Sequence, residues 1–156
     1  MRRRLTNGQK VLINEIITDY PLYKEKLEEC QGELAVIYET LRKTIEAGNT
    51  GSGGSNWTVS DPTSDVILEK YRLEMDLEIY RKYVAPTAKV IEVYRDNAEM
   101  MRLIRMKYWS GQFDWERDRN TDLLIEVLGY TTNERRFYAL LNSFRWKIGI
   151  MHGILK

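Results

Sequence analysis

The sequence predicts an all-α protein. Apolar residues recur three and four positions apart along most of the 156 residues, and the alternating pattern of strands is nearly absent. Proline and glycine interrupt this pattern at spacings that suit helix ends. With 43% hydrophobic and 30% charged residues, the composition is that of a soluble globular domain. No apolar run approaches the ~18 residues of a membrane span, so we expect no membrane association.

The N-terminal segment, residues 1–47, predicts a helical hairpin. Its first helix would cover Gly8–Thr18, with Val11, Leu12, Ile16 and Ile17 buried. Pro21 fits the first turn of a second helix, because its missing N–H costs nothing there. That helix would end at Gly48 and bury one stripe: Tyr23, Leu27, Cys30, Leu34, Ile37 or Tyr38, Leu41 and Ile45.

A flexible linker is predicted over residues 48–63, where Gly51–Ser55 suits either a natural connection or an engineered one. Two central helices would follow over residues 64–109. Thr63 or Ser64 would cap the first, which would run to Val84 and bury Ile67, Tyr71, Leu77, Tyr80 and Val84. Pro86 would separate it from the second, over Thr87–Tyr108, with Val90, Val93 or Tyr94, Met101, Ile104 and Tyr108 inward.

Residues 110–156 predict a helix-turn-helix region. After a polar loop (110–120), a short helix from Thr121 would end at Gly129, and Thr131 with Glu134 forms a capping box that would begin the last helix. One face of that helix would be buried: Phe137, Leu141, Phe144, Ile148, Met151 and Leu155. The other face would be exposed over three turns, and it carries residue types that contact phosphates and purine edges.

These exposed residues form the predicted site for double-stranded DNA. Arg135, Arg136, Ala139 and Asn142 are the expected base contacts, with Asn133 and Ser143 beside them, while Thr131, Thr132 and Arg145 would contact the DNA backbone. Arg2, Arg3 and Arg4 would form either an arm that adds phosphate contacts or a disordered tail. The remaining face carries Trp146, Ile150 and Ile154, which would pack against the N-terminal helices or join a homodimer.

The charge distribution favours the same assignment. Residues 1–10 and 131–156 each carry a net charge of +4, so the rest of the chain sums to −7 within a total of +1. Basic ends around an acidic middle suit a protein that meets phosphate with its ends.

The sequence lacks the residue combinations that a metal site, a phosphate-binding loop or a catalytic site would need. One His and one Cys do not provide the ligands of a His/Cys zinc site, and the glycines at 51–54 lack the Gly-Lys-Ser/Thr of a phosphate loop. His152 has no evident Asp or Ser partner, and the many carboxylates suit solvated helix surface. We therefore expect no enzyme, no cofactor and no metal, with the cytoplasm as the default location.

Three segments resemble a known family. They are Glu15-x-x-x-Asp19-Tyr-Pro-x-Tyr23-x-x-x-Leu27, the Ser60–Thr63 entry after a Gly/Ser-rich break, and Lys107-Tyr108-Trp109 before the two final helices. In this order they resemble the phage late-gene transcription activators of the RinA and ArpU type, whose C-terminal part is similar to region 4 of bacterial sigma factors. The resemblance implies a sigma-like transcription activator encoded by a bacteriophage or prophage. It would act in the bacterial cytoplasm and bind DNA near a promoter, and a contact with RNA polymerase is a further expectation.

Two alternatives stay open. The small packaging (terminase) subunit of a phage also uses a helix-turn-helix, but it assembles into rings. A helical protein-interaction module that does not bind DNA would bury the last helix instead of exposing it.

Overall fold

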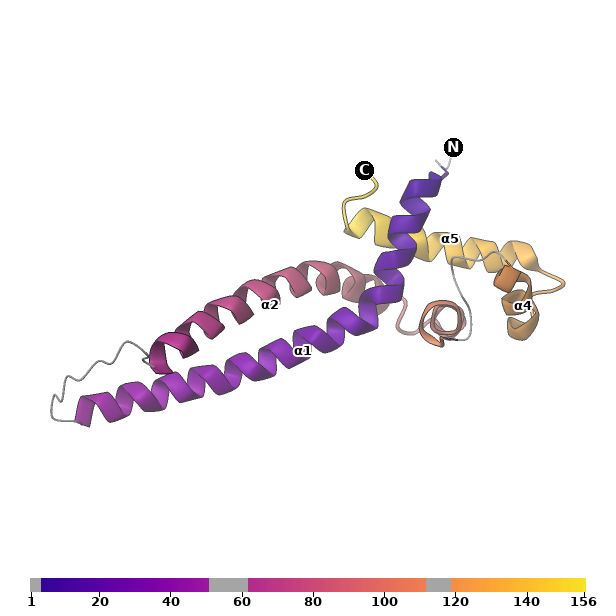
Figure 1. The fold of residues 1–156 in the computed structure, drawn as a ribbon. Helices are drawn as coiled ribbons and strands as arrows, with labels where there is room; N and C mark the ends of the chain where they lie inside the picture. The colour runs from indigo at the N-terminus through magenta and orange to yellow at the C-terminus, as the bar shows by residue number, and fades with distance from the viewer. Residues whose placement is uncertain (1–3, 51–61, 112–118) are drawn as a thin grey trace. The chain divides into compact units, whose positions relative to one another are not determined.

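The computed structural model describes residues 4–50, 62–111 and 119–156. Its elements are α1 (Asn7–Thr50), α2 (Pro62–Val93), α3 (Ala98–Ile104), the π-helix η1 (Arg105–Trp109), α4 (Arg119–Leu128) and α5 (Glu134–Met151), as Figure 1 shows. These ranges contain no strand, which confirms the predicted all-α class. None of the helices described is long and apolar enough to cross a membrane. Arg2, Arg3 and most of the predicted linker lie outside the described residues.

The chain forms two compact units. Unit 1 comprises residues 1–22 and 83–156, and unit 2 comprises residues 23–82. Helices α1 and α2 each run from one unit into the other, so unit 2 interrupts unit 1 in the sequence.

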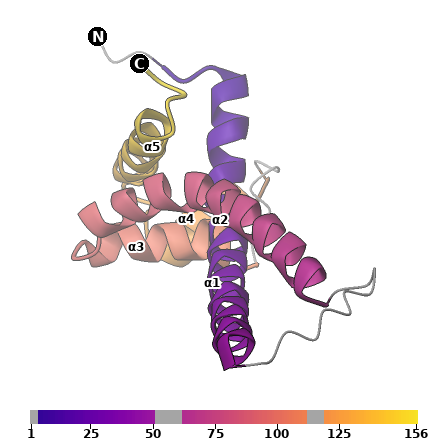
Figure 2. The same ribbon diagram turned by 90° about the vertical axis from the view of Figure 1, so that its left-hand side faces the viewer.

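Unit 1 contains the larger core. Its α5 buries Phe137, Leu141, Phe144 and Ile148, and this spacing places them on one face of the helix as predicted. Met151 was expected on this face but is exposed, because α5 ends there. The first turns of α1 pack against α5, and Figure 2 shows these two segments next to each other. In all, 16 buried apolar residues from α1, α2, α3, η1, α4 and α5 form one cluster.

Helix α1 is continuous, so the predicted break between Thr18 and Pro21 is wrong. A reciprocal cap begins it: Gln9 N donates to Thr6 Oγ1, and Thr6 N donates to Gln9 Oε1. Pro21 then lies inside the helix, where it cannot donate to the carbonyl of Ile17. The indole N–H of Trp109 donates to that carbonyl instead, at 2.7 Å.

This continuity also changes which early side chains are buried. Ile13 and Ile17 lie in the core of unit 1, and Ile16 is half-buried against it. Val11 and Leu12 are exposed, contrary to the prediction.

Helix α2 likewise passes through Pro86, where a break was predicted, and ends at Val93. The real interruption follows at residues 94–97. There Asn97 caps α3, since its side chain accepts from Met100 N at 3.0 Å. The predicted single helix over Thr87–Tyr108 is therefore three elements: the end of α2, α3 and η1.

Unit 2 is an antiparallel pair of helices from α1 and α2. Cys30 and Leu34 are buried against Leu73, and the Cys30 thiol donates to the Leu73 carbonyl. Of the predicted α1 stripe, Cys30 and Leu34 are buried, and Tyr38 and Ile45 are exposed. The other members are half-buried: Tyr23, Leu27, Ile37 and Leu41. On α2 the prediction is wrong at its N-terminal end, where Ile67 and Tyr71 are exposed and Leu73 is buried instead.

Candidate nucleic-acid interface

A helix, a tight turn and a second helix lie where the sequence predicts them. Helix α4 ends at Leu128, and the φ of +81° at the following Gly129 is a left-handed conformation that glycine adopts without strain. Gly129 N donates to Glu126 O at 3.0 Å, and Tyr130 N donates to Ile125 O at 2.8 Å. This pair of bonds is a Schellman motif, which satisfies carbonyls at the helix end and fixes the direction of the turn.

The start of α5 differs from the prediction. Asn133 is the N-cap, and its side chain accepts from Arg136 N at 3.3 Å. The predicted capping box of Thr131 and Glu134 is therefore wrong, because Glu134 is already the first helical residue. Thr131 and Thr132 lie in the turn, and both are exposed. Asparagine caps helices as well as threonine does, so the sequence contained this signal two residues further on.

The predicted outward face of α5 is exposed. Arg135, Ala139 and Asn142 lie on the side of the helix opposite the buried phenylalanines. Ser143 is exposed as well, but its hydroxyl lies 3.0 Å from the hydroxyl of Tyr94. The structure thus brings Arg135, Ala139 and Asn142 together on one solvent-facing surface of about two turns.

Arg136 is held by an ion pair that the sequence did not reveal. Its Nε donates to Glu99 Oε1 at 3.2 Å, and its Nη2 donates to Glu99 Oε2 at 2.8 Å. The Tyr130 hydroxyl donates to the same Oε1. Hydrogen bonds from Arg136 and then Tyr130 lower the pKa of Glu99 to about 2, while burial and the nearby Glu99 raise the pKa of Tyr130 to about 12. These three side chains connect α3 with the turn and with α5.

Arg145 lies in an internal polar cluster. Its Nε donates to Asn14 Oδ1 and to the Tyr108 hydroxyl, both at 3.0 Å, and Tyr108 donates to the same Asn14 oxygen at 2.7 Å. Asn14 and Tyr108 are buried, and burial raises the pKa of Tyr108. Arg145 is half-buried and joins α5 to α1 and η1. A shared contact with the DNA backbone would require Arg145 to lie beside Thr131 and Thr132. The structure does not place it there.

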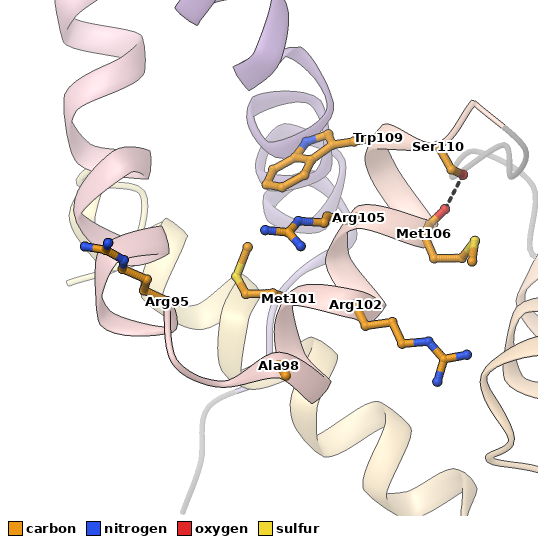
Figure 3. A pocket seen from close by; sticks show the side chains of 8 residues that line it. All are labelled: Arg95, Ala98, Met101, Arg102, Arg105, Met106, Trp109 and Ser110. Carbon is orange, nitrogen blue, oxygen red and sulfur yellow. Dashed lines mark hydrogen bonds between the residues drawn. The ribbon is translucent and has the colours of Figure 1, made fainter.

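A groove on α3 and η1 carries three further arginines that the sequence analysis did not select. It has a volume of about 690 Å³ and is lined by Arg95, Ala98, Met101, Arg102, Arg105, Met106, Trp109 and Ser110. Figure 3 shows Arg105 extended over Met101 with the Trp109 ring beyond it, and Arg102 directed to the other side of the helix. The charge of Arg102 opposes the rise in the pKa of Tyr130. The spacing of Arg102 and Arg105 along an otherwise apolar segment was a usable signal.

The two units carry net charges of opposite sign. Unit 1 has 16 Lys and Arg against 11 Asp and Glu, a net charge of +5, and unit 2 has 8 against 12, a net charge of −4. The predicted surface on α5 and the three groove arginines all belong to the positive unit. At the N-terminal end of this unit, Arg4 is exposed.

The residues expected to pack or dimerise lie at the end of α5. Trp146 and Ile154 are half-buried, and Ile154 packs against the unit 1 core, whereas Ile150 is exposed. His152 Nε2 lies 2.7 Å from the hydroxyl of the buried Thr87, and burial lowers the pKa of His152.

Within the described ranges, no cluster of three or more His, Cys, Asp or Glu side chains is placed to hold a metal ion. The arrangement instead offers guanidinium groups, an exposed amide and hydroxyl groups on the helices of unit 1, which suits recognition of an anionic polymer. No protein-family model, curated protein or solved structure matches this chain.

Proposed function

We propose that unit 1 binds double-stranded DNA through the N-terminal half of α5, and that the protein activates transcription of phage or prophage late genes. The observation that carries the proposal is the exposed row of Arg135, Ala139 and Asn142 on a helix whose other face is fixed in the core. A helix presented in this way fits the major groove, with the residues of its first turns against base edges.

The residue types of this row suit direct readout. Arginine forms paired hydrogen bonds with guanine, and asparagine does so with adenine. Ala139 lies between them and lets the helix backbone approach the bases closely. The Schellman motif at Gly129 and the Asn133 cap support this reading, because both restrict how α5 leaves the turn.

Phosphate contacts would come from the surrounding arginines. Glu99 engages two of the five N–H groups of Arg136, so the remaining donors are available to a phosphate and are held in one orientation. Arg102 on α3 and Arg105 on η1 add two further guanidinium groups to unit 1. The net charge of +5 on unit 1 favours the same partner, since phosphate contacts supply most non-specific affinity for DNA.

The role in activation depends on the resemblance of three segments to the phage late-gene activators. A contact with RNA polymerase belongs to this part of the proposal. The DNA-binding part stands on the α5 surface and is tested separately.

The test compares two arginine substitutions of equal charge change. Arg135→Ala removes the proposed guanine contact, while Arg81→Ala removes an exposed arginine from unit 2. We expect Arg135→Ala to weaken binding by roughly 10- to 100-fold, corresponding to about 1–3 kcal/mol for a paired base contact, and Arg81→Ala to have no effect. Arg136 is unsuitable as the first target because its removal also breaks the Glu99 pair.

Binding is measured by fluorescence anisotropy at several salt concentrations, against DNA from the gene's own surroundings and against the same composition in shuffled order. Wild-type affinity should fall steeply as salt rises. Asn142→Ala should reduce the preference for the native sequence. Equal affinities of Arg135→Ala and Arg81→Ala, with unchanged melting of both, would contradict the proposed surface and support a helical interaction module.

A further inference from the structure

We propose that two copies of this chain associate through an exposed apolar row on α2, with the two α2 helices antiparallel. The row consists of Leu68, Tyr71, Met75 and Ile79 and is called the α2 stripe. It belongs to unit 2, so this inference does not depend on the DNA-binding surface of unit 1.

The α2 stripe is open to solvent in the single chain. Leu68 is 65% exposed, Tyr71 55%, Met75 67% and Ile79 49%. Steps of three and four residues place all four on one side of the helix. Leu73, Leu77 and Tyr80 lie on the opposite side and pack toward α1. This part of α2 is therefore apolar on two faces, which is typical of a helix that is covered on both.

Unit 2 has little core of its own. Cys30, Leu34 and Leu73 are its buried apolar residues in the part that the structure describes. A pair of helices encloses only one shared stripe. A second copy placed on the α2 stripe would cover the other apolar face of α2 and add buried apolar area to unit 2.

The residue order of α2 lets most of the stripe pair with a second copy. The row has steps of three, four and four residues, so its centre matches its own reverse more closely than its ends do. With a two-fold axis near Leu73, Tyr71 of one copy faces Met75 of the other, and Ile67 faces Ile79. Tyr71, Met75 and Ile79 of the row thus each meet an apolar side chain, whereas Leu68 lies opposite Glu78.

Charge favours the antiparallel direction. Asp65 lies in the first turn of α2, and Lys82 lies at the other end of the stripe. An antiparallel pair brings the Asp65 end of each helix beside the Lys82 end of its partner. A parallel pair would set like charges beside each other, which is destabilising.

The area suggests a moderate affinity. At these exposures the four side chains offer roughly 400 Å² of apolar surface per copy, and the stems of neighbouring polar residues add to it. The total is close to the ~1,000 Å² at which specific interfaces begin. We therefore expect a dissociation constant in the micromolar range.

The first experiment is sedimentation equilibrium of the full chain without DNA, at concentrations from about 1 to 300 μM. The wild type should shift from its monomer mass of 18.5 kDa to twice that mass. Met75→Glu should abolish the shift. Val36→Glu is the matched control, because Val36 is 66% exposed in the same unit but lies on α1, and it should dimerise like the wild type.

Circular dichroism establishes whether each variant is folded. A wild type that stays monomeric, an assembly larger than a dimer, or an equal loss of dimer in Val36→Glu would overturn the proposal. None of these outcomes bears on DNA binding, which is measured separately with Arg135→Ala.

A second experiment tests the direction and does not depend on Met75→Glu folding. In an antiparallel pair centred at Leu73, the two positions 68 are about 15 Å apart along the axis, too far for a disulfide. Under oxidation, Leu68→Cys alone should therefore stay uncoupled, while a mixture of Leu68→Cys and Ile79→Cys should form a crosslinked dimer. Native Cys30 is buried and should not react. Efficient coupling of Leu68→Cys to itself would overturn the antiparallel arrangement.

Discussion

The ion pair between Glu99 and Arg136 connects three elements through one carboxylate. Because its folded pKa of about 2 lies below the ordinary 4.5, the charged form of Glu99 is favoured in the folded protein. Its contribution to stability is complete above pH 4.5 and is lost as the pH falls toward 2. The interaction is partly exposed, so solvent reduces its size.

Glu99→Gln should therefore make unfolding less sensitive to acid. We expect the free energy of unfolding of the wild type to decline between pH 4.5 and pH 2, and the decline to be smaller in Glu99→Gln. Urea denaturation at several pH values measures this difference. Glu92→Gln is the control, since it removes a more exposed carboxylate that pairs with Arg95 at 3.5 Å. Identical acid profiles for the wild type and Glu99→Gln would show that the pair does not contribute.

Some residues of the candidate site could be predicted from the sequence, and others could not. The exposure of Arg135, Ala139 and Asn142 follows from helical periodicity, which local sequence encodes. The partners of Arg136 and Arg145 lie 37 and 131 residues away, at Glu99 and Asn14. Such pairs depend on tertiary packing, and no local pattern indicates them.

At the scale of elements, Trp109 explains why α1 passes through a proline. A proline inside a helix costs about 3 kcal/mol, partly because one carbonyl loses its donor. The Trp109 indole replaces that donor at Ile17, and its ring lies 5.9 Å from that of Tyr20. The free carbonyl is thus satisfied by a residue 92 positions away.

This account predicts coupling between two substitutions. Trp109→Phe should lower the free energy of unfolding by about 1–2 kcal/mol, partly because the half-buried carbonyl of Ile17 loses its donor. Pro21→Ala restores a backbone N–H to that carbonyl, so Trp109→Phe should cost less in the Pro21→Ala background. A double-mutant cycle by chemical denaturation measures the difference. Equal costs in both backgrounds would mean that the indole bond does not compensate for the proline.

The same contact shows which elements the sequence could predict. The buried faces of α5 and of the α1 segment in unit 2 follow from spacing alone. The helix ends could not be predicted in this way. Pro21 and Pro86 are tolerated inside helices, and the interruption after Val93 contains neither proline nor glycine. Its signal is the single cap at Asn97, a residue that occurs in many other settings.

At the scale of the whole molecule, the two units should differ in local stability. Unit 1 has 16 clustered buried apolar residues, and the described part of unit 2 has three. Burial of apolar surface is the main stabilising contribution, so helices with little of it open more often.

Hydrogen exchange should reveal this difference. Amides of α1 and α2 within unit 2 should exchange faster at low protein concentration than those of α5. Protection in unit 2 should rise with concentration in the wild type but not in Met75→Glu, because dimerisation covers the α2 stripe. Mass spectrometry of peptides across residues 23–46 and 64–82 gives the measurement. Uniform protection of both units at every concentration would contradict this expectation.

Unit 2 interrupts unit 1 through two helices rather than through loops, which limits how the chain can change in length. The segments of α1 and α2 within unit 2 are called its two arms. One residue inserted in either arm would rotate the following part of that helix by about 100°. Its buried side chains would then no longer face the other helix. Insertions and deletions in this region should therefore occur as matched pairs, one in each arm and each close to a whole number of turns. Engineered variants with the arms extended by seven residues apiece should remain folded, whereas extension of a single arm should not.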